Sequence, residues 1–229
     1  MQKLKDFIVS PIGGKVIMAL SGAMILLFLV GHALGNLLVF SGQESLNTYA
    51  YWLQNNPLLW VFRGSMLLLL ILHVVLALRM YLQNRKARPV TYALNKDLQL
   101  TYSAKTMIFS GVIIFAFIMF HIAHLTLGWV SPTSLDIDAS SRMIDVYSNV
   151  VVGFKQPAIA IFYVMSLLII GLHLHHSIKS LFQTLGFHHE NFHQVIDYLA
   201  PAMIIILTVG FISIPLAALF GYLPVAVMQ

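Results

Sequence analysis

The chain has 229 residues, of which 59% are hydrophobic and 9% are charged, and its net charge is +5. A soluble domain typically has about 25% charged residues, and a soluble fold of this composition would expose far too much apolar surface. The composition therefore predicts an integral membrane protein. The absence of cysteine excludes disulfides, thiolate-ligated iron–sulfur clusters and covalently attached c-type haem in this chain.

Five apolar runs are long enough to cross about 30 Å of hydrocarbon, which takes about 20 helical residues. Because a backbone in lipid must satisfy its own hydrogen bonds, each run is predicted to be a helix. The expected fold is all-α: a single integral membrane domain over residues 1–229, with no tandem repeat of 20–50 residues. The five transmembrane helices are expected at residues 16–40, 58–82, 106–130, 157–178 and 199–223.

Lysine and arginine set the expected orientation, because they are enriched in cytoplasmic loops. Three of the thirteen would lie on one side of the membrane: Arg63, Arg142 and Lys155. The other ten would share the opposite side: Lys3, Lys5, Lys15, Arg79, Arg85, Lys86, Arg88, Lys96, Lys105 and Lys179. The N-terminus is therefore expected in the cytoplasm and the C-terminus outside, and the positive charge is interpreted as topology rather than affinity for nucleic acid. Residues 43–55 are expected to form a short helix at the outer membrane surface.

Four histidines lie well inside the predicted spans: His32, His73, His121 and His173. An ionisable side chain at that depth is costly, so each is a candidate functional residue. The alternative is a neutral histidine that bonds to a backbone carbonyl of a neighbouring helix. His32 and His121 lie past the middle of outward-running spans, and the other two lie past the middle of inward-running spans. We therefore expect an outer pair and an inner pair, very roughly 10–15 Å apart at the helical rise.

Two imidazoles that face each other at one depth can hold an iron atom between them. Haem iron takes axial nitrogen ligands, and a bundle core can provide the flat apolar slot that the macrocycle needs. The pattern therefore predicts two b-type haems, with the outer iron between His32 and His121 and the inner iron between His73 and His173. Zinc is disfavoured, because it takes three or four converging ligands.

Other residues are candidates for secondary roles around these haems. Arg79, six residues past His73, is a candidate partner for a propionate of the inner haem, and the alternative is an ordinary topology anchor. Hydroxyl candidates for the propionates are Ser10, Ser21, Tyr102 and Ser110. His124, three residues past His121, could compete for the iron or contact a quinone. The G-x-x-x-G spacing of Gly31 and Gly35 suits either helix packing or close approach of a macrocycle.

Four segments, in this order, resemble the single-chain di-haem cytochrome b membrane anchor of succinate dehydrogenase and fumarate reductase complexes. They are GHALGN with His32, LHVVLALR with His73 and Arg79, SGVIIFAFIMFH ending at His121, and HLHHSIKSLFQTLG beginning at His173. In that family, histidines on the first four spans bind two haems, the first pairing with the third and the second with the fourth. His176 also lies in the last segment, but the distance from His173 to Leu185 and Gly186 fits the family's ligand.

The resemblance implies an assembly in the bacterial cytoplasmic (inner) membrane, the respiratory complex II of the tricarboxylic acid cycle. A flavoprotein and an iron–sulfur protein on the cytoplasmic face would interconvert succinate and fumarate. Electrons would pass through the inner and then the outer haem to an exchangeable membrane quinone, expected to be menaquinone. This chain would carry electrons, and the dicarboxylate chemistry would belong to its partners. Glu44 is the candidate for quinone proton exchange, with an ordinary solvated acid as the alternative.

Two other functions are weighed against this one. The first is a di-haem b subunit of another quinone-linked dehydrogenase, acting on formate, hydrogen or nitrate, which the order of the motifs disfavours. The second is a transporter or channel in which the histidines relay protons. A relay favours carboxylates within the spans, and the first four predicted spans contain no Asp or Glu.

Overall fold

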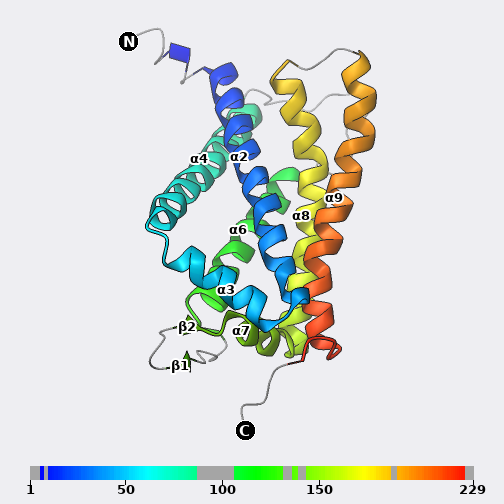
Figure 1. The fold of residues 1–229 in the computed structure, drawn as a ribbon. Helices are drawn as coiled ribbons and strands as arrows, with labels where there is room; N and C mark the ends of the chain where they lie inside the picture. The colour runs from blue at the N-terminus through cyan, green and yellow to red at the C-terminus, as the bar shows by residue number, and fades with distance from the viewer. Residues whose placement is uncertain are drawn as a thin grey trace.

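The computed structural model describes residues 6–7, 10–86, 106–130, 136–138, 143–186 and 190–224. Five long helices dominate it (Figure 1): α2 (Pro11–Leu37), α4 (Leu58–Lys86), α6 (Met107–His121), α8 (Pro157–Thr184) and α9 (Glu190–Leu219). Each contributes a segment long and apolar enough to cross a membrane. The prediction of an all-α bundle with five spanning helices is confirmed.

Shorter elements gather at one end of the bundle, which we call the α3–α7 end (Figure 1). Two of them prolong spanning helices: the 3-10 turn η1 (Leu38–Ser41) follows α2, and the π-helical turn η2 (Ile122–Thr126) follows α6. The others are the helices α3 (Gln43–Gln54) and α7 (Val146–Phe154), and the antiparallel strands β1 (Asp136–Asp138) and β2 (Met143–Ile144). The helix expected over residues 43–55 is confirmed as α3.

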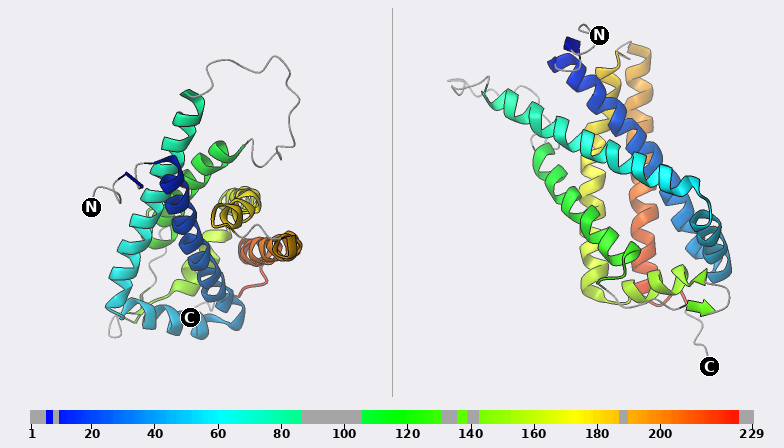
Figure 2. Two further views of the ribbon diagram at one scale, coloured as in Figure 1. Left: turned by 90° about the horizontal axis from the view of Figure 1, so that it is seen from above. Right: turned by 90° about the vertical axis from the view of Figure 1, so that its left-hand side faces the viewer.

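The four helices that carry His32, His73, His121 and His173 form a ring. Helices α2 and α6 each pack against both α4 and α8, so α2 lies diagonally opposite α6, and α4 lies diagonally opposite α8. Helix α9 lies outside the ring, against α8 and α2, as the view from above shows (Figure 2). Facing helices of such a bundle project side chains into a shared centre, where bundles build their cofactor and metal sites.

Helix ends differ from the predicted span ends where a helix continues beyond the hydrocarbon-length run. Helix α2 begins at Pro11, because Ser10 caps it with its hydroxyl oxygen, which accepts the N–H of Gly13 at 3.0 Å. Ser10 therefore caps α2, and its contact with a propionate stays a prediction. Helix α8 continues to Thr184 and ends beside Gly186, whose φ of 84° suits a helix terminus.

The third and fifth spans end earlier than expected. The π turn after α6 stops at Thr126, two residues before Gly128 with its φ of 65°, rather than at residue 130. The fifth spanning segment is Ile196–Leu219 instead of 199–223. Both differences arise because a hydropathy run records where apolar residues stop, whereas a helix stops where the backbone turns.

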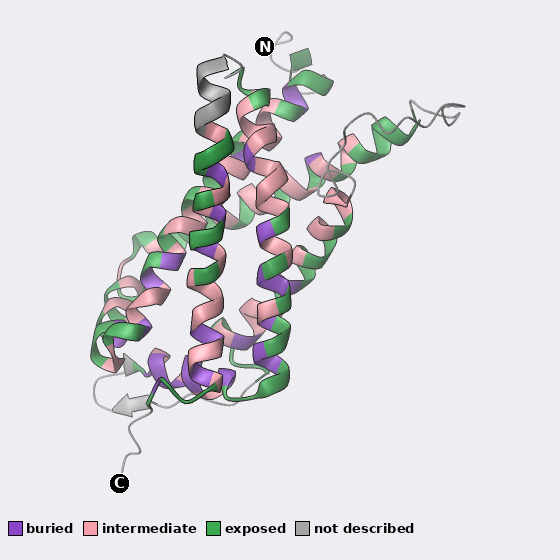
Figure 3. Ribbon diagram, turned by 90° about the vertical axis from the view of Figure 1, so that its right-hand side faces the viewer, coloured by how far each residue is buried: buried purple, intermediate pink, exposed green. Residues whose placement is uncertain are grey.

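Burial is uneven across the bundle (Figure 3). Helices α7, α8 and α9 contribute most of the larger core, at the α3–α7 end, whereas Leu76 alone is buried within the described length of α4. Large apolar side chains cover the outside of the spanning helices, for example Leu67, Ile113 and Ile206. The chain is therefore a multi-pass membrane protein whose apolar outer surface contacts lipid.

The end opposite α3 and α7 carries most of the described basic residues, and we call it the basic end. Helix α2 starts there, and α4 and α8 finish there (Figure 1). Lys179 of α8 forms an ion pair with Asp197 of α9 at 2.8 Å. Six basic residues used for the topology prediction lie outside the described residues: Lys3, Lys5, Arg88, Lys96, Lys105 and Arg142.

A buried carboxylate ties α3 to α7. Asp145, 2% exposed, accepts hydrogen bonds from Gln43 Nε2 at 2.7 Å, Asn47 Nδ2 at 2.9 Å and the N–H of Ser148 at 3.0 Å. Burial alone would raise the pKa of Asp145, but the hydrogen bonds from Ser148, Asn47 and Gln43 favour the charged form and lower the pKa below its ordinary value. The ionised carboxylate therefore holds the first turn of α3 against the start of α7.

Asp145→Ala should destabilise the protein by about 1–3 kcal/mol, because buried donors lose their acceptor. Since folding lowers the pKa of Asp145, its charge stabilises the fold above the ordinary carboxyl pKa of about 4 and stops doing so as pH falls through the lower folded value. Thermal unfolding in detergent should therefore separate wild type from Asp145→Asn fully at neutral pH and progressively less below about pH 4.

The matched control is Gln54→Ala, at the exposed end of α3, which should leave the unfolding temperature unchanged. A stability difference between wild type and Asp145→Asn that stays constant from neutral pH to pH 3 would contradict the role assigned to the charged form.

Candidate functional site

The structure brings His32 and His121 into contact across the ring. His32 lies near the end of α2 and His121 ends α6, and their ring centroids are 5.9 Å apart with planes at 88°. Aromatic side chains surround them: Phe28 stacks on His32 at 5.2 Å, and Phe117 lies 5.9 Å from His121. Two imidazoles from opposite helices therefore meet in an apolar environment near the α3–α7 end.

His73 and His173 occupy the other diagonal. His73 lies on α4 and His173 on α8. The Nδ1 atom of each ring reaches the neighbouring helix. His73 Nδ1 lies 3.2 Å from the carbonyl oxygen of Met18 and 3.4 Å from Ser21 Oγ, and His173 Nδ1 lies 3.0 Å from Ser110 Oγ.

The contact with Met18 fixes which nitrogen of His73 carries the proton. A carbonyl oxygen only accepts, so Nδ1 is the N–H donor, and the lone pair of the neutral ring lies on Nε2. A histidine bonded to a neighbouring backbone carbonyl was the non-functional alternative considered from the sequence. The same bond is also what a metal-ligating histidine makes with its other nitrogen, so it leaves Nε2 available as a ligand.

The outer pair has the separation that two axial ligands require. With bonds of about 2.0–2.1 Å, as histidine makes to zinc, ring centroids on opposite sides of one metal ion are roughly 6 Å apart. The centroids of His32 and His121 are 5.9 Å apart. No group of three or more His, Asp or Glu side chains suited to a metal ion occurs among the residues that the structure describes. The two imidazoles supply two nitrogen donors, which is the number of axial positions on a haem iron.

His124 lies beside this pair rather than in it. It sits on the π turn η2, is 3% exposed, and its Nδ1 is 2.9 Å from the hydroxyl of Tyr163. That hydroxyl is also 3.3 Å from His121 Nδ1, so Tyr163 links the two histidines. The buried Nε2 of His124 has no hydrogen-bond partner in the described part of the chain, and it faces Gly153 of α7. π-helical turns are frequent at functional sites.

Tyr163 did not stand out in the sequence. A hydroxyl-bearing aromatic residue inside an apolar span is the signal that could have singled it out, because a buried tyrosine hydroxyl usually finds a polar partner. Its ring also packs edge-on against Phe117 and Phe154, so it joins α6, α7 and α8 around the outer pair.

The two candidate quinone residues lie in different surroundings. Glu44 is exposed on the first turn of α3, beside a shallow surface pocket that is also lined by Ser45, Thr48, Tyr49 and Trp52. His124 is enclosed between α6, α7 and α8. A molecule at the protein surface could therefore reach Glu44, whereas His124 is enclosed.

The glycines near His32 have different neighbours. A Cβ at Gly35 would lie 2.8 Å from the ring of Tyr49, so this glycine lets α3 pack closely on α2. A Cβ at Gly31 would meet nothing within 4 Å. Of the two interpretations of the G-x-x-x-G spacing, helix packing accounts for Gly35, and Gly31 faces open space.

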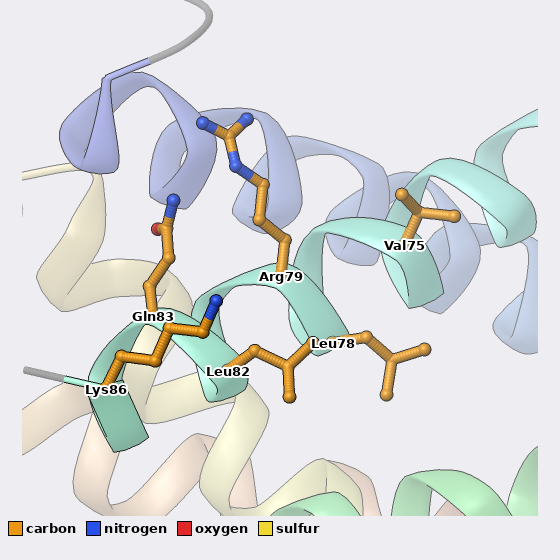
Figure 4. Close-up of a pocket in the computed structure, with 6 residues that line it drawn as sticks. All are labelled: Val75, Leu78, Arg79, Leu82, Gln83 and Lys86. Atoms are coloured by element: carbon orange, nitrogen blue, oxygen red, sulfur yellow. The ribbon is translucent and has the colours of Figure 1, made fainter.

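Arg79 lies on α4, two turns beyond His73 toward the basic end. It lines a shallow open groove with Val75, Leu78, Leu82, Gln83 and Lys86, all from the same helix (Figure 4). Its side chain extends toward α2, together with that of Gln83 (Figure 4). Contact of Arg79 with a propionate stays a prediction. Of the hydroxyl candidates, Ser21 and Ser110 contact histidines, and Tyr102 lies outside the described residues.

Comparisons with protein-family models, curated proteins and solved structures found no match to the chain. The fold itself defines a class: a multi-pass helical membrane protein in which a ring of four helices presents two sets of histidines on its two diagonals.

Gly153→Ala should destabilise the protein by about 1–3 kcal/mol, as other overpacking substitutions do. The new Cβ would lie 2.8 Å from His124 Nε2, and the hydrogen bond to Tyr163 holds that ring in place. Thermal unfolding in detergent measures the change. Gly64→Ala is the matched control, because its Cβ would meet nothing within 4 Å. Equal stability of the two variants would show that His124 is not fixed against α7.

Proposed function

We propose that this chain is the membrane anchor and electron-transfer subunit of a succinate:quinone oxidoreductase, a succinate dehydrogenase or fumarate reductase. In this role it passes electrons between an iron–sulfur subunit and a membrane quinone through two b-type haems. The observation that carries the proposal is the 5.9 Å approach of His32 and His121 across the helix ring. Opposed imidazoles at this separation suit the axial positions of one iron.

The residues of the chain would hold each haem in a distinct way. His32 and His121 would ligate the outer haem with Phe28 and Phe117 packed beside them, which keeps water from the site. His73 and His173 would ligate the inner haem, each with its Nδ1 bonded to a neighbouring helix. Haem b, when bound, supplies reversible one-electron transfer.

Sidedness supports the direction of electron flow. The basic end would face the cytoplasm of the bacterial inner membrane, because lysine and arginine accumulate on that side. His73 and His173 lie past the middle of helices that finish at the basic end, so the inner haem would be the one nearer the flavoprotein and iron–sulfur subunits. His32 and His121 lie toward the α3–α7 end, where a quinone would be reduced or oxidised.

The quinone, expected to be menaquinone, would meet the chain at the α3–α7 end. Glu44 is exposed on α3 beside a surface pocket, which supports it as a proton-exchanging residue over the buried His124. The choice of succinate as electron donor rests on the order and spacing of the four histidine motifs, which resemble those of the succinate dehydrogenase and fumarate reductase anchors.

A proton relay is the alternative from another class, and one observation favours it. His121, Tyr163 and His124 are linked through one hydroxyl, as the members of a relay would be. The chain of contacts stops at His124 Nε2, which has no partner among the described residues. A relay also gives no reason for the facing of His32 and His121.

The complex purified from membranes should contain two b-type haems per chain. His32→Ala and His121→Ala should remove the same haem, because each deletes one of its two ligands, and His73→Ala and His173→Ala should remove the other. Reduced-minus-oxidised spectra and haem extraction measure this. His175→Ala, two residues from His173 on α8, is the control and should keep both haems.

Loss of different haems from His32→Ala and His121→Ala would overturn the pairing, and a complex without b-type absorbance would overturn the proposed function. Succinate-dependent quinone reduction by the same preparation distinguishes this complex from a formate, hydrogen or nitrate enzyme. Quinone reduction by one of those donors, without response to succinate, would assign the chain to the other dehydrogenase class.

A further inference from the structure

Helices α2 and α6 carry the same local sequence. Residues 18–32 read MALSGAMILLFLVGH, and residues 107–121 read MIFSGVIIFAFIMFH. The two segments agree at the first methionine, at the Ser-Gly step, at one isoleucine, at one phenylalanine and at the final histidine. The serine precedes that histidine by eleven residues in both. Eleven residues are close to three helical turns, so serine and histidine share a face about 16 Å apart.

The repeated Ser-Gly steps make equivalent contacts in the structure. Ser21 of α2 reaches His73 of α4, and Ser110 of α6 reaches His173 of α8. The glycine that follows each serine lies against the same ring. A Cβ at Gly22 would be 3.1 Å from His73 Cε1, and a Cβ at Gly111 would be 3.7 Å from His173 Cε1. Helix α2 therefore contacts the imidazole of His73 on α4, and helix α6 contacts that of His173 on α8 in the same way.

The hydrogen-bond directions follow from the backbone contacts of the two serines. Ser21 donates its hydroxyl hydrogen to the carbonyl of Met18 at 3.0 Å, and Ser110 donates to that of Met107 at 2.9 Å. A hydroxyl has one hydrogen, so each serine oxygen can only accept from the imidazole. The Nδ1 atoms of both histidines are therefore the donors, and the neutral rings carry their lone pairs on Nε2.

We propose that Ser21, Gly22 and Ser110 are positioning residues for the inner histidine pair. Each serine accepts the Nδ1 hydrogen, so that Nε2 of His73 or His173 is presented as the ligand, and Gly22 leaves room for the ring of His73. This inference rests on the proposed function, because the group that Nε2 meets is the inner haem iron. An acceptor at Nδ1 raises the basicity of a ligating imidazole, which stabilises the oxidised iron.

The hydrogen bonds from the two histidines to their serines differ in strength. His73 Nδ1 has a second acceptor, the carbonyl of Met18 at 3.2 Å, and its contact with Ser21 is the longer one at 3.4 Å. His173 Nδ1 has Ser110 at 3.0 Å. Loss of Ser110 should therefore affect the inner iron more than loss of Ser21.

Redox titration of the inner haem in the assembled complex tests this order. Ser110→Ala should raise its midpoint potential, by about 59 mV if the preference for ferric iron falls tenfold. Ser21→Ala should raise it less, and Ser110→Thr should restore the wild-type value, because it keeps the hydroxyl. Ser166→Ala is the control, since that hydroxyl donates to the carbonyl of Phe162 and bonds to no histidine among the described residues.

Gly22→Ala is a second test that removes no hydrogen-bonding group. The added Cβ would lie 3.1 Å from His73 Cε1, so the ring of His73 must shift slightly. This shift should change the low-spin electron paramagnetic resonance signal of the inner haem and leave that of the outer haem unchanged. If the complex with Ser110→Ala does not assemble, Gly22→Ala still tests the inference.

The outcomes separate this inference from the proposed function. If His173→Ala removes the inner haem while Ser110→Ala and Gly22→Ala leave its potential and its signal unchanged, the positioning role is wrong and the haem assignment stands. If His173→Ala removes no haem, the proposed function fails first. A higher midpoint potential in Ser110→Ala, together with the wild-type potential in Ser110→Thr, supports the inference.

Discussion

Every imidazole that sits in hydrocarbon must satisfy one N–H donor and one lone pair, and this constraint organises the centre of the bundle. The ring of four helices satisfies the donors of the inner pair through neighbouring helices, at Met18 for His73 and at Ser110 for His173. The lone pairs on Nε2 remain, and the hydrocarbon core of a membrane offers no water that could donate a hydrogen bond to them. In the proposed function, a haem iron between His73 and His173 would take up these two lone pairs, which is the physical basis of the di-haem proposal.

The remaining elements hold the ring in this arrangement. Helix α9 packs along α8 and α2 from outside the ring, so it supports α2, the helix that carries His32. Asp145 joins α3 to α7 beneath the outer pair, and Tyr163 connects α8 to both histidines at the end of α6. Helix α4 buries little of its surface within the chain, which leaves it the most lipid-exposed wall of the ring.

The sequence predicted the five spans and the separation of the histidines by depth, because hydropathy and helical rise are local properties. It did not predict where α2 starts or where α8 stops, because Ser10 and Gly186 act through backbone geometry rather than hydrophobicity. Tyr163 was missed because its partners come from another helix. The Ser-Gly repeat was missed because its copies lie 89 residues apart, beyond the spacing of a tandem repeat. These contacts join residues of different helices, so they form only when the four helices pack together.

The most direct test is a cryo-electron microscopy map of the complex purified from membranes, at a resolution that shows side chains. We expect planar density with a metal peak between His32 and His121 on one diagonal, and a second such feature between His73 and His173 on the other. Side chains or lipid filling both places, with the imidazoles bonded only to protein, would contradict the central claim that these histidines are paired ligands.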